Sequence, residues 1–112
     1  MLKSTTVAIY TSDIRKVWHT VTDNTNCMWR SDLVRTDVLS DVSFFGHSPN
    51  GLRSTYRITC KIPYEKYAYS IDNNSFTGSW IGLFFVTESG GTRIEFTETR
   101  KFKNPLMEII SY

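Results

Sequence analysis

The sequence predicts one α+β domain built on a curved antiparallel sheet. Three observations lead to this prediction: the length of 112 residues, a hydrophobic content of 40% beside 21% charged residues, and an apolar alternation that recurs in successive segments. A chain of this length buries roughly two thirds of its unfolded surface around one core. The composition is far from the low-hydrophobicity, high-charge signature of disorder. We therefore expect residues 1–112 to form a single domain.

The first segments predict a strand followed by a helix. Leu2–Tyr10 is rich in Thr, Val and Ile, which favour strands. Ser12 and Asp13 then offer helix N-caps. Asp23–Asn26 ends the helix with residues that favour turns, and Cys27–Arg30 is expected to be a short helical or irregular segment. The apolar residues of the predicted helix recur at helical spacing: Ile14, Val17, Trp18 and Val21.

After residue 32 the apolar period becomes two, which predicts a meander of about six strands. The alternation is cleanest after the Ser48–Gly51 turn, where Tyr56, Ile58 and Cys60 are expected to point inward. Short turns between consecutive strands imply antiparallel pairing. The expected strands are Leu33–Leu39, Val42–Phe45, Leu52–Ile62, Tyr67–Asn73, Phe76–Thr87 and Ile94–Phe102.

Charge and motif content exclude several functional classes. The net charge is +2 and the basic residues are scattered among acidic ones, so the sequence lacks the cluster of basic residues expected of a nucleic-acid binder. No segment approaches the roughly 18 apolar residues of a membrane span, and Met1–Thr6 lacks the apolar run of a signal peptide, so we expect a cytoplasmic protein. Cys27 and Cys60 form no CxxC pair, and neither His19 nor His47 has a companion at metal-ligand spacing. We predict neither a metal nor a cofactor.

A series of short motifs resembles one known superfamily. In chain order they are Val17-Trp18, Thr22-Asp23, Trp29-Arg30-Ser31-Asp32-Leu33, Gly51 before a long strand, Gly78-Ser79-Trp80, and Gly90 to Glu98. Their order and spacing resemble the SRPBCC superfamily, the helix-grip proteins that include START-related lipid carriers and polyketide-cyclase-like proteins. The resemblance covers nearly the whole chain. It implies a curved antiparallel sheet of six to seven strands, short N-terminal helices, and a ligand cavity between the sheet and a long C-terminal helix.

This chain departs from the superfamily pattern at its end. Asn104 and Pro105 predict a helix start, but only Pro105–Tyr112 follows the last strand, so we expect a truncated C-terminal helix. Uncovered apolar surface costs about 25 cal/mol per Å², and several hundred Å² would cost on the order of ten kcal/mol. A partner subunit, a hydrophobic ligand or a longer natural chain would supply the cover. Because Ile81, Leu83 and Phe85 make one strand apolar on its second face as well, we predict a homodimer.

The aromatic residues, 14% of the chain, either fill a bulky core or line a cavity. Tyr56, Tyr69 and Trp80 each join an apolar body to a hydrogen-bonding tip that would orient a ligand. Glu98 and Arg100 share a strand face, and they either hold each other beside the ligand or are ordinary surface charges. The residues expected to bind ligand are Trp29, Tyr56, Ile58, Tyr69, Ile71, Trp80, Phe84, Phe96 and Glu98.

Three functions fit these patterns. The first is a noncatalytic carrier or sensor of a small hydrophobic molecule, aromatic or lipid-like. The second is a polyketide cyclase- or dehydratase-like enzyme in which Glu98 acts as acid or base beside Arg100. The third is a protein-interaction module that uses the exposed sheet. No Ser/His/Asp or Cys/His arrangement supports a catalytic nucleophile.

Overall fold

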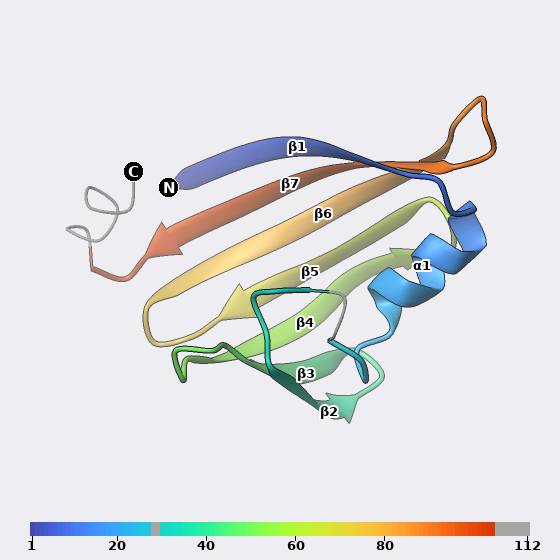
Figure 1. Cartoon of the computed structure of the whole chain (residues 1–112). Coiled ribbons are helices and arrows are strands. Elements are labelled where there is room, and N and C mark those ends of the chain that lie inside the picture. The colour runs from blue at the N-terminus through green and yellow to red at the C-terminus, as the bar shows by residue number, and fades with distance from the viewer. Residues whose placement is uncertain (28–29, 105–112) are drawn as a thin grey trace.

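The protein folds as one curved antiparallel sheet with a helix packed on it. The structure, a computed structural model, describes residues 1–27 and 30–104. Within them the sheet has seven strands in the order β1-β7-β6-β5-β4-β3-β2. Figure 1 shows the sheet bending around α1 and the loop that follows it. The elements are β1 (Leu2–Tyr10), α1 (Ile14–Thr22), β2 (Arg35–Ser40), β3 (Ser43–His47), β4 (Arg53–Ile62), β5 (Lys66–Asp72), β6 (Phe76–Val86) and β7 (Thr92–Phe102).

The predicted meander is confirmed, with six antiparallel strands after the helix. β2 begins at Arg35 and not at Leu33; the Leu33 side chain is buried and lies against Gly46. The predicted segment Cys27–Arg30 is described only at its ends, where the Arg30 backbone N–H donates to the Cys27 carbonyl at 3.1 Å. The predicted C-terminal helix lies outside the described residues.

Helix α1 is capped and amphipathic, as predicted. The Asp13 side chain accepts a hydrogen bond from the backbone N–H of Lys16 at 3.0 Å. Trp18 is buried, and its ring lies edge-on to Phe84 and Tyr67 with centroid distances of 5.0 and 6.0 Å. We call the sheet face that carries Phe84 and Tyr67 the inner face, and the opposite one the outer face. No helix among the described residues has the length and hydropathy to cross a membrane.

Five aromatic rings cross the inner face on five neighbouring strands. The ring centroids of Phe44 and Tyr56 are 4.7 Å apart, and those of Tyr56 and Tyr69 are 5.4 Å apart. Trp80 continues the series at 5.4 Å from Tyr69 and 5.6 Å from Phe96. All four distances lie in the range where aromatic pairs attract each other. We call these five rings the aromatic ladder; they are five of the seven Phe, six Tyr and three Trp residues of the chain.

A register shift in β4 reverses the predicted orientation of Cys60. Ile58 pairs with Tyr69, whereas Cys60 pairs with Ala68. Directly opposed residues in an antiparallel pair share a face, and the consecutive residues Ala68 and Tyr69 point to opposite faces. Cys60 therefore lies on the outer face, and the prediction that it points inward with Tyr56 and Ile58 is wrong.

The outer face of β6 is apolar, as the sequence predicts. Ile81, Leu83 and Phe85 are 40%, 38% and 37% exposed. The Arg93 guanidinium lies over the Phe85 ring, 4.8 Å from its centroid, and forms an ion pair with Glu95 at 3.4 Å. Long side chains of β7 thus cover part of this apolar surface within the same chain.

Candidate functional site

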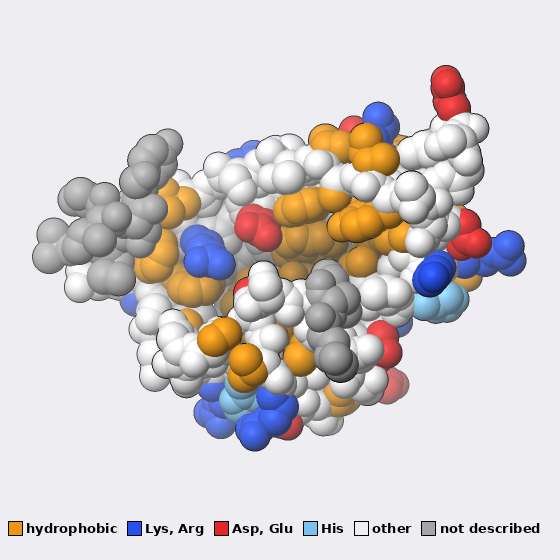
Figure 2. All heavy atoms as spheres, in the orientation of Figure 1, with side chains coloured by type: hydrophobic (Ala, Val, Ile, Leu, Met, Phe, Trp, Pro, Cys, Tyr) orange, Lys and Arg blue, Asp and Glu red, His pale blue; other side chains and the backbone are white. Residues whose placement is uncertain are grey.

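A cleft of about 290 Å³ opens on the inner face, toward the end of the sheet where β7 finishes. Tyr56, Tyr69 and Trp80 of the aromatic ladder line it, together with Ile71. Figure 2 shows apolar side chains gathered in a hollow on this face of the molecule. The uncharged polar part of the lining comes from Ser48, Asn50, Ser54, Ser75, Ser79 and Thr99, and the charged part from Arg30, Asp32, Glu98 and Arg100. The cleft therefore combines an aromatic wall with hydroxyl and amide groups.

The structure gathers about half of the predicted ligand-binding residues at this cleft. The residues that line it are Tyr56, Tyr69, Ile71, Trp80 and Glu98. Phe84 is buried against Trp18, and Phe96 lies beside Trp80 at the end of the ladder. Ile58 packs against the hydrophobic core. Trp29 lies outside the described residues.

Gly82 allows the Trp80 indole to lie flat along β6. A Cβ at Gly82 would stand 2.7 Å from Cζ3 of Trp80 and closer still to Cη2, nearer than real Cβ atoms approach. The indole is almost parallel to the Tyr69 ring, with 9° between their planes. A glycine two residues after a tryptophan in one strand faces the same side, and this spacing is the signal that would have identified its role.

We expect Gly82→Ala to push the indole off the sheet and lower the free energy of unfolding by about 1–3 kcal/mol. Urea denaturation measures the stability, and the tryptophan emission maximum reports the displaced ring. Gly90→Ala is the control, because a Cβ at this position would have no atom within 4 Å. Its only cost is the positive φ of 85°, which disfavours any residue other than glycine. That variant should lose stability without a change in emission. Native stability and emission in Gly82→Ala would contradict the packing described.

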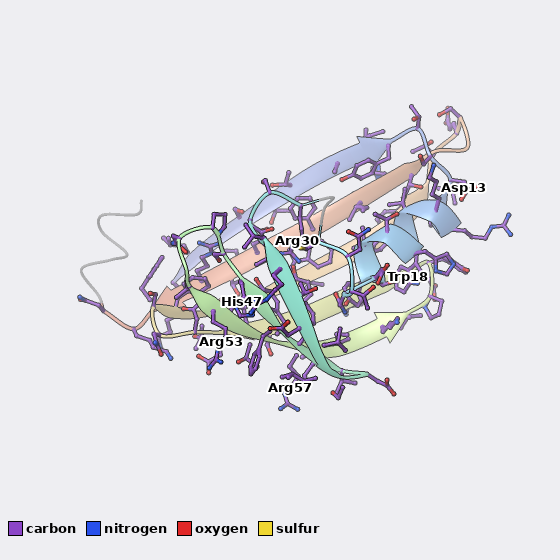
Figure 3. The ribbon with its side chains drawn as sticks, turned by 60° about the horizontal axis from the view of Figure 1, so that its bottom comes forward. Asp13, Trp18, Arg30, His47, Arg53 and Arg57 are labelled. Atoms are coloured by element: carbon purple, nitrogen blue, oxygen red, sulfur yellow. The ribbon has the colours of Figure 1, made fainter. Side chains whose placement is uncertain are left out.

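The loop after α1 places Arg30 over the aromatic ladder. Its Nε and Nη2 donate to the two carboxylate oxygens of Asp32, each at 2.7 Å. The guanidinium carbon lies 5.7 Å from the centroid of the Tyr56 ring, and the Arg30 side chain is only 15% exposed. In Figure 3, Arg30 lies above the sheet, whereas Arg53 and Arg57 point away from it on the other side. A bidentate pair of this kind fixes the guanidinium plane at the wall of the cleft.

Burial and the Arg30–Asp32 pair set the protonation of the cleft. Burial raises the pKa of Tyr69 and of Tyr56, and the nearby Arg30 opposes that rise. Burial is the largest single effect on the pKa of Arg30 and acts to lower it, but the hydrogen bond to Asp32 and the electrostatic interactions with Asp32, Tyr69 and Tyr56 together raise that pKa. Burial is likewise the largest effect on the Asp32 carboxyl and acts to raise its pKa, yet the hydrogen bond and charge of Arg30, with smaller contributions, hold the pKa of Asp32 below its usual range. The cleft thus presents neutral phenols beside a fixed ion pair at neutral pH.

Glu98 and Arg100 lie at the cleft and are both exposed. Within the described part of the chain no ion pair joins them, so the alternative in which they hold each other does not apply. The Arg100 guanidinium instead lies over the Phe76 ring, 4.6 Å from its centroid. In the same residues, no group of three His, Cys, Asp or Glu side chains is placed to hold a metal ion.

The polar lining of the cleft is what sequence reasoning missed. Ser48 and Asn50 belong to the turn between β3 and β4, and Ser75 to the turn between β5 and β6. In an antiparallel meander these two turns fall at the same end of the sheet. That rule would have predicted a polar rim around Ile71 and Trp80. Sequence reasoning also missed Asp32 as the partner of Arg30. The signal that could have found it is an acidic residue two positions after an arginine in a loop.

Comparison with known proteins identifies the fold. No protein-family model matches the sequence. No curated protein matches it either. Among solved structures, a START superfamily protein from Mycobacterium smegmatis is 9% identical, with a TM-score of 0.80 over 92% of this chain and 79% of that one. A conserved protein from Geobacillus kaustophilus is also 9% identical, with a TM-score of 0.81 over 95% and 78% of the two chains.

A third solved structure, the protein XoxI from Bacillus cereus, is 18% identical, with a TM-score of 0.79 over 96% of this chain and 82% of that one. Identities this low establish the fold and nothing finer. The structural likeness agrees with the motifs that run from Val17-Trp18 to Glu98 in the sequence. The chain therefore has the START-like fold that its resemblance to the SRPBCC superfamily implies.

Proposed function

We propose that the cleft binds one small ligand with an aromatic ring and a polar group, and that the protein acts as a noncatalytic carrier or sensor of it. The observation that carries the proposal is the stacked pair of Tyr69 and Trp80 on the cleft wall, with ring centroids 5.4 Å apart. The free face and the edges of such a stack can pack against a planar aromatic ligand. The neighbouring hydroxyl and amide groups supply orientation.

The size of the cleft narrows the class of ligand. Its volume of about 290 Å³ is at the lower end of the roughly 300–1,000 Å³ typical of small-molecule sites. One or two fused rings fill such a space, whereas a long acyl chain needs more. Of the two ligand types that the sequence suggests, the aromatic one is therefore better supported than the lipid-like one. The START-like fold also supports a ligand on this face of the sheet.

The carrier function is preferred to catalysis because of the state of Glu98. The protonation state of a catalytic carboxyl group is adjusted by burial or by a charged group close to it. Glu98 is exposed and forms no ion pair with Arg100 or another described residue. The cyclase-like alternative has no comparable observation in its favour.

Trp80→Ala should weaken the binding of an aromatic probe by roughly tenfold or more, because the stacking surface is lost. We suggest 2-naphthol as the probe and isothermal titration calorimetry as the measurement, with dodecanoate as the acyl-chain comparison. Phe85→Ala is the matched control, since it removes an aromatic ring from the same strand on the outer face. It should leave the affinity within about twofold.

Two results would refute the proposed function. One is the absence of saturable one-to-one binding of any ring compound to the native protein. The other is equal affinity in the native protein and in a folded Trp80→Ala variant. Stronger binding of dodecanoate than of 2-naphthol would replace the aromatic ligand with a lipid-like one.

A further inference from the structure

Within residues 1–27 and 30–104, no strand pairs with the outer edge of the nine-residue strand β1. It lies at the end of the strand order and pairs only with β7, in a register that runs unbroken from Leu2 opposite Arg100 to Tyr10 opposite Thr92. No other strand in the described part of the chain bonds to its outer edge. The outward N–H and C=O groups of such a strand form a template onto which another strand can add.

The opposite edge of the sheet is protected, and β1 is not. β2 is six residues long, has a register shift between Val38 and Ser40, and carries an Arg35–Asp37 ion pair. Shortness, irregularity and charge are the features that prevent edge strands from pairing with other chains. β1 is nine residues long, contains no proline and no register shift, and carries a single charged residue, Lys3, close to its start.

Apolar side chains accompany the free edge of β1. Val7 and Ile9 point to the outer face and are 53% and 71% exposed. A strand added beside β1 would place cross-strand neighbours next to both side chains and remove them from water. The same stretch therefore offers unpaired backbone groups and exposed apolar side chains together.

We propose that two copies of this chain associate through β1, with β1 of one copy antiparallel to β1 of the other across a two-fold axis. When a two-fold axis lies beside an edge strand, that strand pairs with the same strand of the second copy in antiparallel orientation. Each copy then covers the free edge of the other. Charge favours the same arrangement. Antiparallel pairing places the two Lys3 residues at opposite ends of the interface, whereas parallel pairing would set these like charges side by side.

This interface differs from packing of the outer faces. Ile81, Leu83 and Phe85 offer a second apolar surface, but Arg93 and Glu95 already cover part of it. A dimer through the outer face would depend on Leu83, which lies on β6, two strands from the edge. A dimer through β1 would not depend on Leu83. The two arrangements are therefore separable by substitution.

The test is the mass of the untagged chain by light scattering over a concentration series up to roughly 100 μM. We expect the native protein to approach twice 13.0 kDa as concentration rises. Val7→Lys should raise the dimer dissociation constant by roughly tenfold or more, because it sets a charge into the strand pair. Val38→Lys is the matched control: a valine on the other edge strand, 52% exposed beside the 53% of Val7. It should dimerise like the native protein, and so should Leu83→Lys.

Circular dichroism should show native folding in all three variants, because each substituted side chain is already exposed in one copy. Three results would overturn the proposal: a native protein that stays at one chain's mass throughout, a folded Val7→Lys variant that dimerises normally, or a dimer broken by Leu83→Lys and not by Val7→Lys. None of these outcomes depends on ligand binding in the cleft.

Discussion

Replacing Trp18 with alanine should lower the free energy of unfolding by about 3–5 kcal/mol, a large share of the roughly 5–15 kcal/mol of a typical domain. Trp18 is 3% exposed and is the main contact between α1 and the sheet. Its ring centroid lies 5.0 Å from that of Phe84 and 6.0 Å from those of Tyr64 and Tyr67. Deleting the indole leaves a cavity that Val17, the other buried residue of α1, is too small to fill.

Urea denaturation followed by circular dichroism measures this loss. Arg15→Ala is the control on the same helix, since Arg15 is exposed and its replacement should change stability by less than about 0.5 kcal/mol. Equal stability of Trp18→Ala and Arg15→Ala would show that α1 does not depend on this contact.

The second large effect is expected at Asn73, in the turn between β5 and β6. Asn73 is 7% exposed, and its Oδ1 accepts hydrogen bonds from the backbone N–H groups of Ser75 and Phe76, both at 2.8 Å. Its Nδ2 donates to Oγ of Ser54 at 3.0 Å. Asn73→Ala leaves the buried Phe76 N–H and the buried Ser54 hydroxyl without this partner, whereas the N–H of the exposed Ser75 can bond to water. Because each buried unsatisfied group costs about 1–3 kcal/mol, we expect a loss of about 2–6 kcal/mol.

Asn74→Ala is a close control, because the neighbouring asparagine is exposed. It should be nearly neutral. Asn73→Asp keeps an oxygen for the two N–H groups and loses only the donor to Ser54, so its stability should fall between those of the native protein and Asn73→Ala. Denaturation of all four proteins gives the ranking, and an Asn73→Ala variant as stable as Asn74→Ala would contradict it.

The strands and α1 could be predicted from the sequence because their signals are local. Asp13 and the apolar residues at helical spacing specify the capped helix. The alternation along the strands places both Tyr56 and Tyr69 on the inner face. The pattern fails at Cys60 for a physical reason. Cys60 and Ile62 continue the alternation, so nothing in the residue types marks the register shift after Ile58.

The candidate site could be predicted only in part, because it is assembled from both strands and loops. Strand periodicity identifies Tyr69, Ile71 and Trp80 as inward-facing. The position of Arg30 depends on the path of the loop after α1, and no periodic pattern specifies that path. The sequence left open whether Glu98 and Arg100 hold each other, and their side chains diverge because the Phe76 ring offers the guanidinium another neighbour.

The aromatic ladder has a consequence for how the chain folds. Each of its five rings comes from a different strand, so no single hairpin can assemble it. The rings of Phe44 and Phe96 stand at its two ends and belong to distant parts of the chain. Each ring contact, however, joins two strands that follow one another in the chain, so it requires the closure of only one short loop. The ladder can therefore grow by one ring with each hairpin, and every strand that joins the sheet gains an aromatic contact with the strand before it.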